Sequence, residues 1–151
     1  MKIDGISARK GRDSMEIQKL ITKAVEAKKY AYVPYSQFRV GAALLTEDGT
    51  IYTGCNIENV SFGATNCAER TAVFKAVSEG KRTFQAIAIT GDNGDYLPPC
   101  GICRQVLQEF AGDSLKIILA NDTEDYKVTT LGELLPGAFS SKNLNGTADN
   151  T

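Results

Sequence analysis

Three of the four cysteines in this chain of 151 residues lie in two short segments that constrain the fold more than any other feature. Cys100 and Cys103 form a Cys-x-x-Cys pair directly after two prolines, with 32 residues between Cys67 and Cys100. The paired thiolates can reach one ion, and a distant segment supplies the third. Glu69, two residues after Cys67, adds a carboxylate. Three soft ligands and a nearby acid predict a zinc site whose fourth position is open for water.

Two other interpretations of the cysteines compete with an open zinc site. Free cysteines usually behave as small buried apolar residues, so the first alternative is that the three are ordinary core residues. A Pro-Cys-Gly-x-Cys turn after a flexible loop is poor core material, which counts against this interpretation. Cys55 offers a fourth sulfur for a closed structural site, but a closed site would leave Glu69 without a task. Without the cysteines, Glu69 itself would be interpreted as a solvated residue on a helix surface.

The charge pattern and composition narrow the class of partner. The formal net charge is −1, and Lys and Arg are not gathered on one stretch, so the chain lacks the electrostatic footprint of a protein that binds nucleic acid or an anionic membrane. No run is long enough to span a membrane, and the N-terminus lacks the apolar core of a secretory signal. Free cysteines without an export signal predict a cytoplasmic protein. Because the chain has no histidine, proton transfer must use a carboxylate, Lys, Tyr, Cys or metal-bound water.

The hydrophobic pattern predicts helices that alternate with strands. A helix is expected from Asp13 to before Pro34, and others over residues 67–77, 100–110 and 131–135. Strands are expected over residues 38–46, 51–54, 84–90, 115–120 and 127–130. Asp48-Gly49 predicts a tight hairpin between the first two strands. These elements predict one α/β domain over residues 14–139, with helices on both faces of one sheet, a flexible arm over residues 1–13 and a flexible tail over residues 140–151.

The expected helix starts favour metal binding by the cysteines. Cys67 and Cys100 both fall where a helix begins, and the unpaired N–H groups there lower the pKa of a thiol. Three thiolates on Zn²⁺ leave a net charge of −1, which makes a bound water a weaker acid. A guanidinium that donates to the sulfurs would offset this charge, and Arg70 and Arg104 are the candidates. The alternative for both is ordinary ion pairing at the surface.

Five motifs occur in one order along the chain: Tyr35-Ser36-x-Phe38-x-Val40-Gly41-Ala42, Gly54-Cys55-Asn56-Ile57-Glu58-Asn59, Cys67-Ala68-Glu69-Arg70-Thr71, Pro99-Cys100-Gly101-x-Cys103-Arg104-Gln105 and Leu134-Leu135-Pro136-x-x-Phe139. Together they make residues 30–139 resemble the small zinc-dependent cytidine deaminases of the homotetrameric, three-cysteine type. The resemblance implies a three-layer α-β-α sandwich whose mixed sheet of about five strands opens with an antiparallel hairpin.

The resemblance also implies the chemistry. Cys67, Cys100 and Cys103 would hold Zn²⁺, and zinc-bound hydroxide would attack C4 of the pyrimidine. Glu69 would shuttle protons to N3 and then to the departing amine. The implied reaction is hydrolytic deamination of cytidine and deoxycytidine to uridine and deoxyuridine in pyrimidine salvage.

Substrate contacts follow from the same resemblance. Phe38 would pack on the pyrimidine, Asn56 and Glu58 would hold the ribose 3′-hydroxyl, and the backbone around Ala68 and Cys100 would contact the edges of the base. Arg70, Arg104 and Gln105 would lie beside the metal, around its ligands. Phe139 would cross a subunit boundary of a homotetramer and lie over a neighbour's substrate. Phe62 departs from the family pattern, which often has Tyr there, so a hydroxyl contact between subunits is absent.

Two other functions share parts of this pattern. A blasticidin-type aminonucleoside deaminase would use the same zinc motifs, but Glu58 in an Asn-x-Glu setting argues for a free ribose hydroxyl. A non-catalytic zinc module that stabilises a fold or binds RNA is the second alternative. The lack of a basic face counts against RNA.

Overall fold

The computed structural model describes residues 4–145, and within them one mixed sheet has the strand order β2-β1-β3-β4-β5. Its strands are β1 (Val40–Thr46), β2 (Ile51–Cys55), β3 (Phe84–Gly91), β4 (Lys116–Ala120) and β5 (Tyr126–Thr130). β1 pairs antiparallel with both β2 and β3, β3 pairs parallel with β4, and β5 returns antiparallel. The predicted opening hairpin and the five-stranded mixed sheet are confirmed.

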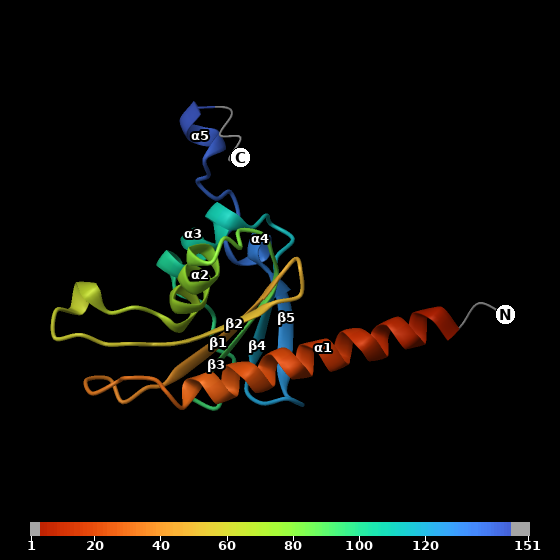
Figure 1. Cartoon of the computed structure of the whole chain (residues 1–151), viewed down its shortest axis with the longest axis horizontal. Coiled ribbons are helices and arrows are strands. Elements are labelled where there is room, and N and C mark those ends of the chain that lie inside the picture. The colour runs from red at the N-terminus through yellow and green to blue at the C-terminus, as the bar shows by residue number, and fades with distance from the viewer. Residues whose placement is uncertain (1–3, 146–151) are drawn as a thin grey trace.

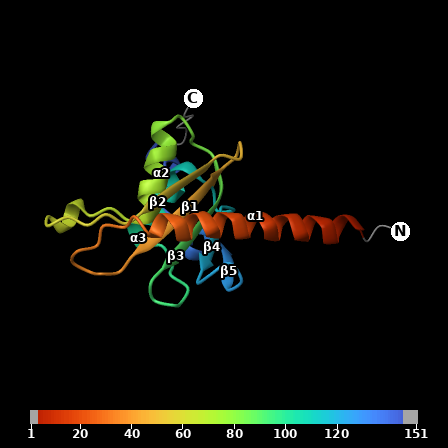
Figure 2. The ribbon, with the colours of Figure 1, turned by 60° about the horizontal axis from the view of Figure 1, so that its bottom comes forward.

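Helices cover both faces of this sheet (Figure 1, Figure 2). The long helix α1 (Asp4–Lys28) lies across one face, while α2 (Ala68–Ser78) and α3 (Gly101–Phe110) lie on the other. Three short helices complete the described chain: η1 (Phe62–Ala64), α4 (Leu131–Leu134) and α5 (Lys142–Asn145). None of the described helices is long and apolar enough to cross a membrane. The predicted three-layer sandwich is confirmed.

The central strand β3 shows why the two faces differ. Successive side chains of a strand point to opposite faces. Ile87 and Ile89 pack in the core beneath α2 and α3, whereas Ala86 and Ala88 pack beneath α1. Small side chains on one face let α1 approach the sheet closely, and a Cβ added at Gly41 of β1 would lie 2.0 Å from the Ala24 carbonyl oxygen.

The first helix differs from its predicted range at both ends. It begins at Asp4 instead of Asp13, so most of the predicted N-terminal arm is helical. No proline lies in residues 4–12, and extending an anchored helix adds one hydrogen bond for each residue that is fixed. The helix ends at Lys28 instead of continuing toward Pro34, because residues 29–31 donate to carbonyls three residues back and tighten the chain into turns.

The C-terminal tail also departs from the prediction, since Lys142–Asn145 form the short helix α5. Residues 1–3 and 146–151 lie outside the described residues. The boundaries of the single domain, 14–139, and the flexibility of the arm and tail therefore stay predictions.

Gly54→Ala tests how tightly α2 is seated on the sheet. An added Cβ would lie 2.3 Å from the Ala68 carbonyl oxygen and 2.6 Å from the Ala72 backbone nitrogen. Because relief requires movement of the α2 backbone, we expect urea unfolding to show a loss of about 3 kcal/mol. Gly63→Ala is the control, since nothing lies within 4 Å of its added Cβ, and it should change stability by less than about 0.5 kcal/mol. Equal effects of the two substitutions would contradict the close seating of α2.

Candidate metal centre

The sheet topology brings the starts of two helices to the same edge. β2 and β3 run in the same direction because both pair antiparallel with β1. α2 follows β2 and α3 follows β3, so both helices begin near the carboxyl ends of these strands. Cys67 immediately precedes α2, and Cys100 immediately precedes α3, each with extended backbone. Two segments far apart in the sequence therefore present their cysteines to one another.

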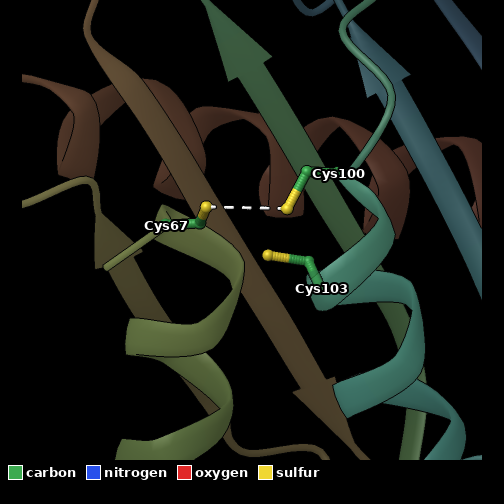
Figure 3. Close-up of side chains that lie close together, drawn as sticks. All are labelled: Cys67, Cys100 and Cys103. Carbon is green, nitrogen blue, oxygen red and sulfur yellow. Dashed lines mark hydrogen bonds between the residues drawn. The ribbon is translucent and has the colours of Figure 1, made fainter. Parts of the chain in front are cut away.

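Three sulfurs converge at this point (Figure 3). The Sγ atoms of Cys67, Cys100 and Cys103 all lie within 4.8 Å of one another, and the Cys67 and Cys100 sulfurs are 3.8 Å apart. Zn–S bonds of about 2.3 Å at tetrahedral angles place two sulfurs about 3.8 Å apart, so the trio fits Zn²⁺. Among the described residues, the cluster does not include Cys55. The cysteines therefore do not form a zinc site closed by a fourth sulfur. Cys100 is exposed and Cys67 half-buried, which also argues against a purely apolar core.

Neighbouring groups shift the pKa of two of the three thiols, Cys67 and Cys103. The Arg70 Nη2 group donates to Cys67 Sγ at 3.3 Å, as predicted from charge balance. Interaction with the neighbouring Cys103 thiol, assisted by Arg70, lowers the pKa of Cys67. The same interaction with Cys67, together with burial, raises the pKa of Cys103. The first thiolate is therefore favoured at Cys67, and a bound cation would displace the remaining thiol protons.

Glu69 lies beside the sulfurs in the first turn of α2. Its side chain is only 4% exposed, and Oε2 accepts a hydrogen bond from Cys103 Sγ at 3.7 Å. Two residues along a helix interior would diverge by about 200°, but Cys67 precedes the helix and its side chain is free to turn toward Glu69. Burial raises the pKa of Glu69 to about 7. The arrangement places a group able to carry a proton next to the three-sulfur cluster.

Arg104 and Gln105 contact the backbone instead of the sulfurs. Arg104 donates from Nε to the Pro99 carbonyl at 2.8 Å and from Nη1 to the Leu134 carbonyl at 2.6 Å. The prediction that its guanidinium donates to the sulfurs is wrong, because position 104 is turned about 100° around α3 from Cys103. Gln105 Nε2 donates to the Phe139 carbonyl at 2.9 Å. Arg104 thereby secures the residue that precedes Cys100.

A cavity of about 170 Å³ opens beside the cluster. Six of its lining residues were singled out from the sequence: Phe38, Asn56, Cys67, Ala68, Glu69 and Cys100. Three others were not: Val40, Leu97 and Pro98. Their only signal was position, since Val40 lies within a motif and the other two directly precede Pro99-Cys100. The buried Glu69 carboxylate therefore shares this cavity with an aromatic and apolar wall. The volume of the cavity suits a small planar ring.

The remaining predicted residues lie at different distances from this cavity. Asn56 lines it, yet its amide also binds the backbone, accepting from Val40 N and donating to the Phe38 carbonyl, both at 2.8 Å. Glu58 is absent from the lining, and its Oε1 accepts from Tyr35 N and Ser36 N at 3.0 Å. Hydrogen bonds from Ser36 lower the pKa of Glu58. Phe139 is 59% exposed and does not line the cavity.

Known proteins are similar to this chain in sequence and in fold. The profile of the cytidine and deoxycytidylate deaminase zinc-binding region matches residues 14–119. A cytidine deaminase of Sporosarcina psychrophila is 54% identical over 135 residues, which cover 89% of this chain and 99% of that protein. One from Halalkalibacterium halodurans is 53% identical, covering 87% and 99%.

A solved structure of a cytidine deaminase from Burkholderia pseudomallei superposes with a TM-score of 0.77 at 50% identity, covering 80% of this chain and 97% of that one. The family profile spans more than half of the chain, and these relatives match over nearly their whole length. The chain belongs to the zinc-binding cytidine and deoxycytidylate deaminase family.

Proposed function

We propose that this protein hydrolyses cytidine and deoxycytidine to uridine and deoxyuridine with release of ammonia. The observation that carries the proposal is the buried Glu69 carboxyl, which lies in one cavity with two sulfurs of a cluster that fits Zn²⁺. Family membership and relatives named cytidine deaminase at more than half identity support the same substrate class. A non-catalytic zinc module would have no use for this cavity.

The proposed chemistry divides between the ion and one carboxylate. Cys67, Cys100 and Cys103 would hold the zinc ion, which would supply a Lewis acid that lowers the pKa of water and makes it nucleophilic near neutral pH. Glu69 would accept one proton from the attacking water and deliver it to N3 of the pyrimidine. It would then accept the second proton of the same oxygen and deliver it to the departing amino group. The oxygen of water becomes the O4 of uridine, and the amine leaves as ammonia. The burial of Glu69 keeps bulk water from competing for these protons.

Five residues orient the nucleoside in this proposal. Phe38 packs on the pyrimidine from the cavity wall, and the backbone at Ala68 and Cys100 contacts the edges of the base. Asn56 and Glu58 hold the ribose 3′-hydroxyl. Among the hydrogen bonds of the described chain, those to Glu58 fall on Oε1, so Oε2 is the oxygen assigned to the sugar.

Exposed apolar side chains support assembly into a homotetramer with active sites near subunit boundaries. Tyr30, Val60 and Phe62 are 82%, 78% and 75% exposed, and Phe62 lies in η1, on a loop that extends away from the sheet (Figure 1). Exposed apolar groups of this size are typical of surfaces that another subunit covers. Phe139 is the residue assigned to a neighbour's substrate. The proposed setting is pyrimidine salvage in the cytoplasm, where the four free cysteines stay reduced.

Glu69→Gln is the direct test of the proposed proton carrier. The amide keeps the shape of the side chain but cannot exchange the proton, so kcat for cytidine should fall by at least about 10²-fold. Ultraviolet absorbance follows cytidine loss, and elemental analysis should show that zinc is retained. Glu79→Gln, an exposed substitution just beyond the end of α2, is the matched control and should keep wild-type turnover. Near-normal activity of zinc-loaded Glu69→Gln would refute the role.

The assembly is tested by light scattering after gel filtration. We expect a mass four times the chain's 16.3 kDa, and Phe62→Asp should lower it by placing a charge in a buried contact. Lys142→Asp on the exposed α5 is the control and should leave the mass unchanged. A wild-type protein that is fully active at the mass of one chain would contradict the tetramer.

A further inference from the structure

The segment that carries Phe38 into the cavity is held by side chains from three places. Three successive backbone N–H groups donate to side-chain oxygens: Phe38 to Ser36 Oγ at 3.0 Å, Arg39 to Asp92 Oδ2 at 3.1 Å and Val40 to Asn56 Oδ1 at 2.8 Å. Gln37, just before them, has φ of 56°, a left-handed conformation that persists in a non-glycine residue only when its surroundings impose it. The conformation of this segment is therefore imposed by these hydrogen bonds and not by the intrinsic backbone preference of its residues.

Asp92 makes the most extensive of these contacts. Its Oδ2 also accepts from Arg39 Nε at 2.9 Å, and Oδ1 accepts from Arg39 Nη2 at 3.3 Å. Lys28 Nζ lies 3.1 Å from the same Oδ1. Arg39 holds the pKa of Asp92 at about 2, so the carboxylate stays charged at neutral pH. One side chain at the end of β3 thus joins the end of α1 to the entry of β1.

The Phe38 ring is seated against the residue next to Asp92. A Cβ built on Gly91 would lie 3.1 Å from Phe38 Cζ and 2.9 Å from Leu97 Cδ2, so both side chains pack onto the bare backbone of Gly91. Phe38 and Leu97 both line the cavity. The end of β3 therefore supports the Phe38 ring through Gly91, and it supports the backbone of the adjacent Arg39 through Asp92.

We propose that Asp92 is a positioning residue for nucleoside binding, which holds Arg39 and so keeps the Phe38 ring in place to receive the pyrimidine. The proposal rests on the proposed function. Asp92 does not line the cavity, so its effect on substrate passes through Phe38. A wall that is ordered before binding spares the substrate the entropic cost of ordering it. Loss of Asp92 should therefore weaken substrate binding and leave the chemical step at Glu69 intact.

Asp92→Ala in the full-length, zinc-loaded enzyme tests this role. We expect KM for cytidine to rise about tenfold, with kcat within about twofold of wild type. Asp92→Asn keeps an acceptor for the Arg39 N–H group and should recover part of the loss, and Arg39→Ala should reproduce the rise. Asp48→Ala is the matched control, because Asp48 forms its ion pair with Lys81 at the β1–β2 turn and does not line the cavity. Its KM should not change.

A double-mutant cycle separates positioning from general destabilisation. Phe38→Ala should raise KM by itself, and adding Asp92→Ala should raise it no further, because the group on which Asp92 acts is gone. Additive effects, or an unchanged KM in both Asp92→Ala and Arg39→Ala, would overturn the positioning role while the deaminase activity of the wild type stands. Failure of the wild type to convert cytidine would instead overturn the proposed function and this inference with it.

Discussion

The meeting of two helix starts is the constraint on which the rest of this structure depends. β2 and β3 share a direction because β1 lies antiparallel between them, and the helices that follow them begin at one edge of the sheet. The cysteines at these starts bring three sulfurs within 4.8 Å. Thiolates gain there from unpaired N–H groups and from the positive ends of the helix dipoles. The topology thus turns two distant sequence motifs into one cation site.

The seating of α2 connects this site to the sheet. Gly54 lies against the backbone of α2 at Ala68, the residue between Cys67 and Glu69. The position of a sulfur and of the neighbouring carboxyl is therefore set by how closely the helix packs on β2. On the opposite wall of the cavity, Gly91 lets Phe38 and Leu97 approach β3. Two glycines whose Cβ atoms would clash define the two sides of the proposed nucleoside site.

The sequence was most informative where chemistry depends on short spacing. The Cys-x-x-Cys pair, the third cysteine and the nearby Glu69 were predicted together because few other structures need these residues at this spacing. Arg70 was predicted from charge balance and does donate to Cys67. Arg104 offered the same charge, but one residue of helical rotation directs it to the Pro99 and Leu134 carbonyls. Charge alone does not reveal the direction of a side chain.

Contacts that depend on strand register could not be predicted from the sequence. Asp92 and Arg39 are 53 residues apart, and they meet only because Val40 pairs with Gly91 across β1 and β3. The early start of α1 was missed because residues 4–12 carry no clear helix signal of their own, and the helix extends from the portion packed on the sheet.

The proposed metal centre is a zinc ion held by three sulfurs, with its fourth position left to the oxygen of a water. X-ray absorption at the zinc edge of the purified protein measures the ligand set directly. We expect three sulfurs at about 2.3 Å and one oxygen at about 2.0 Å. Four sulfur ligands, or a zinc environment without sulfur, would contradict it.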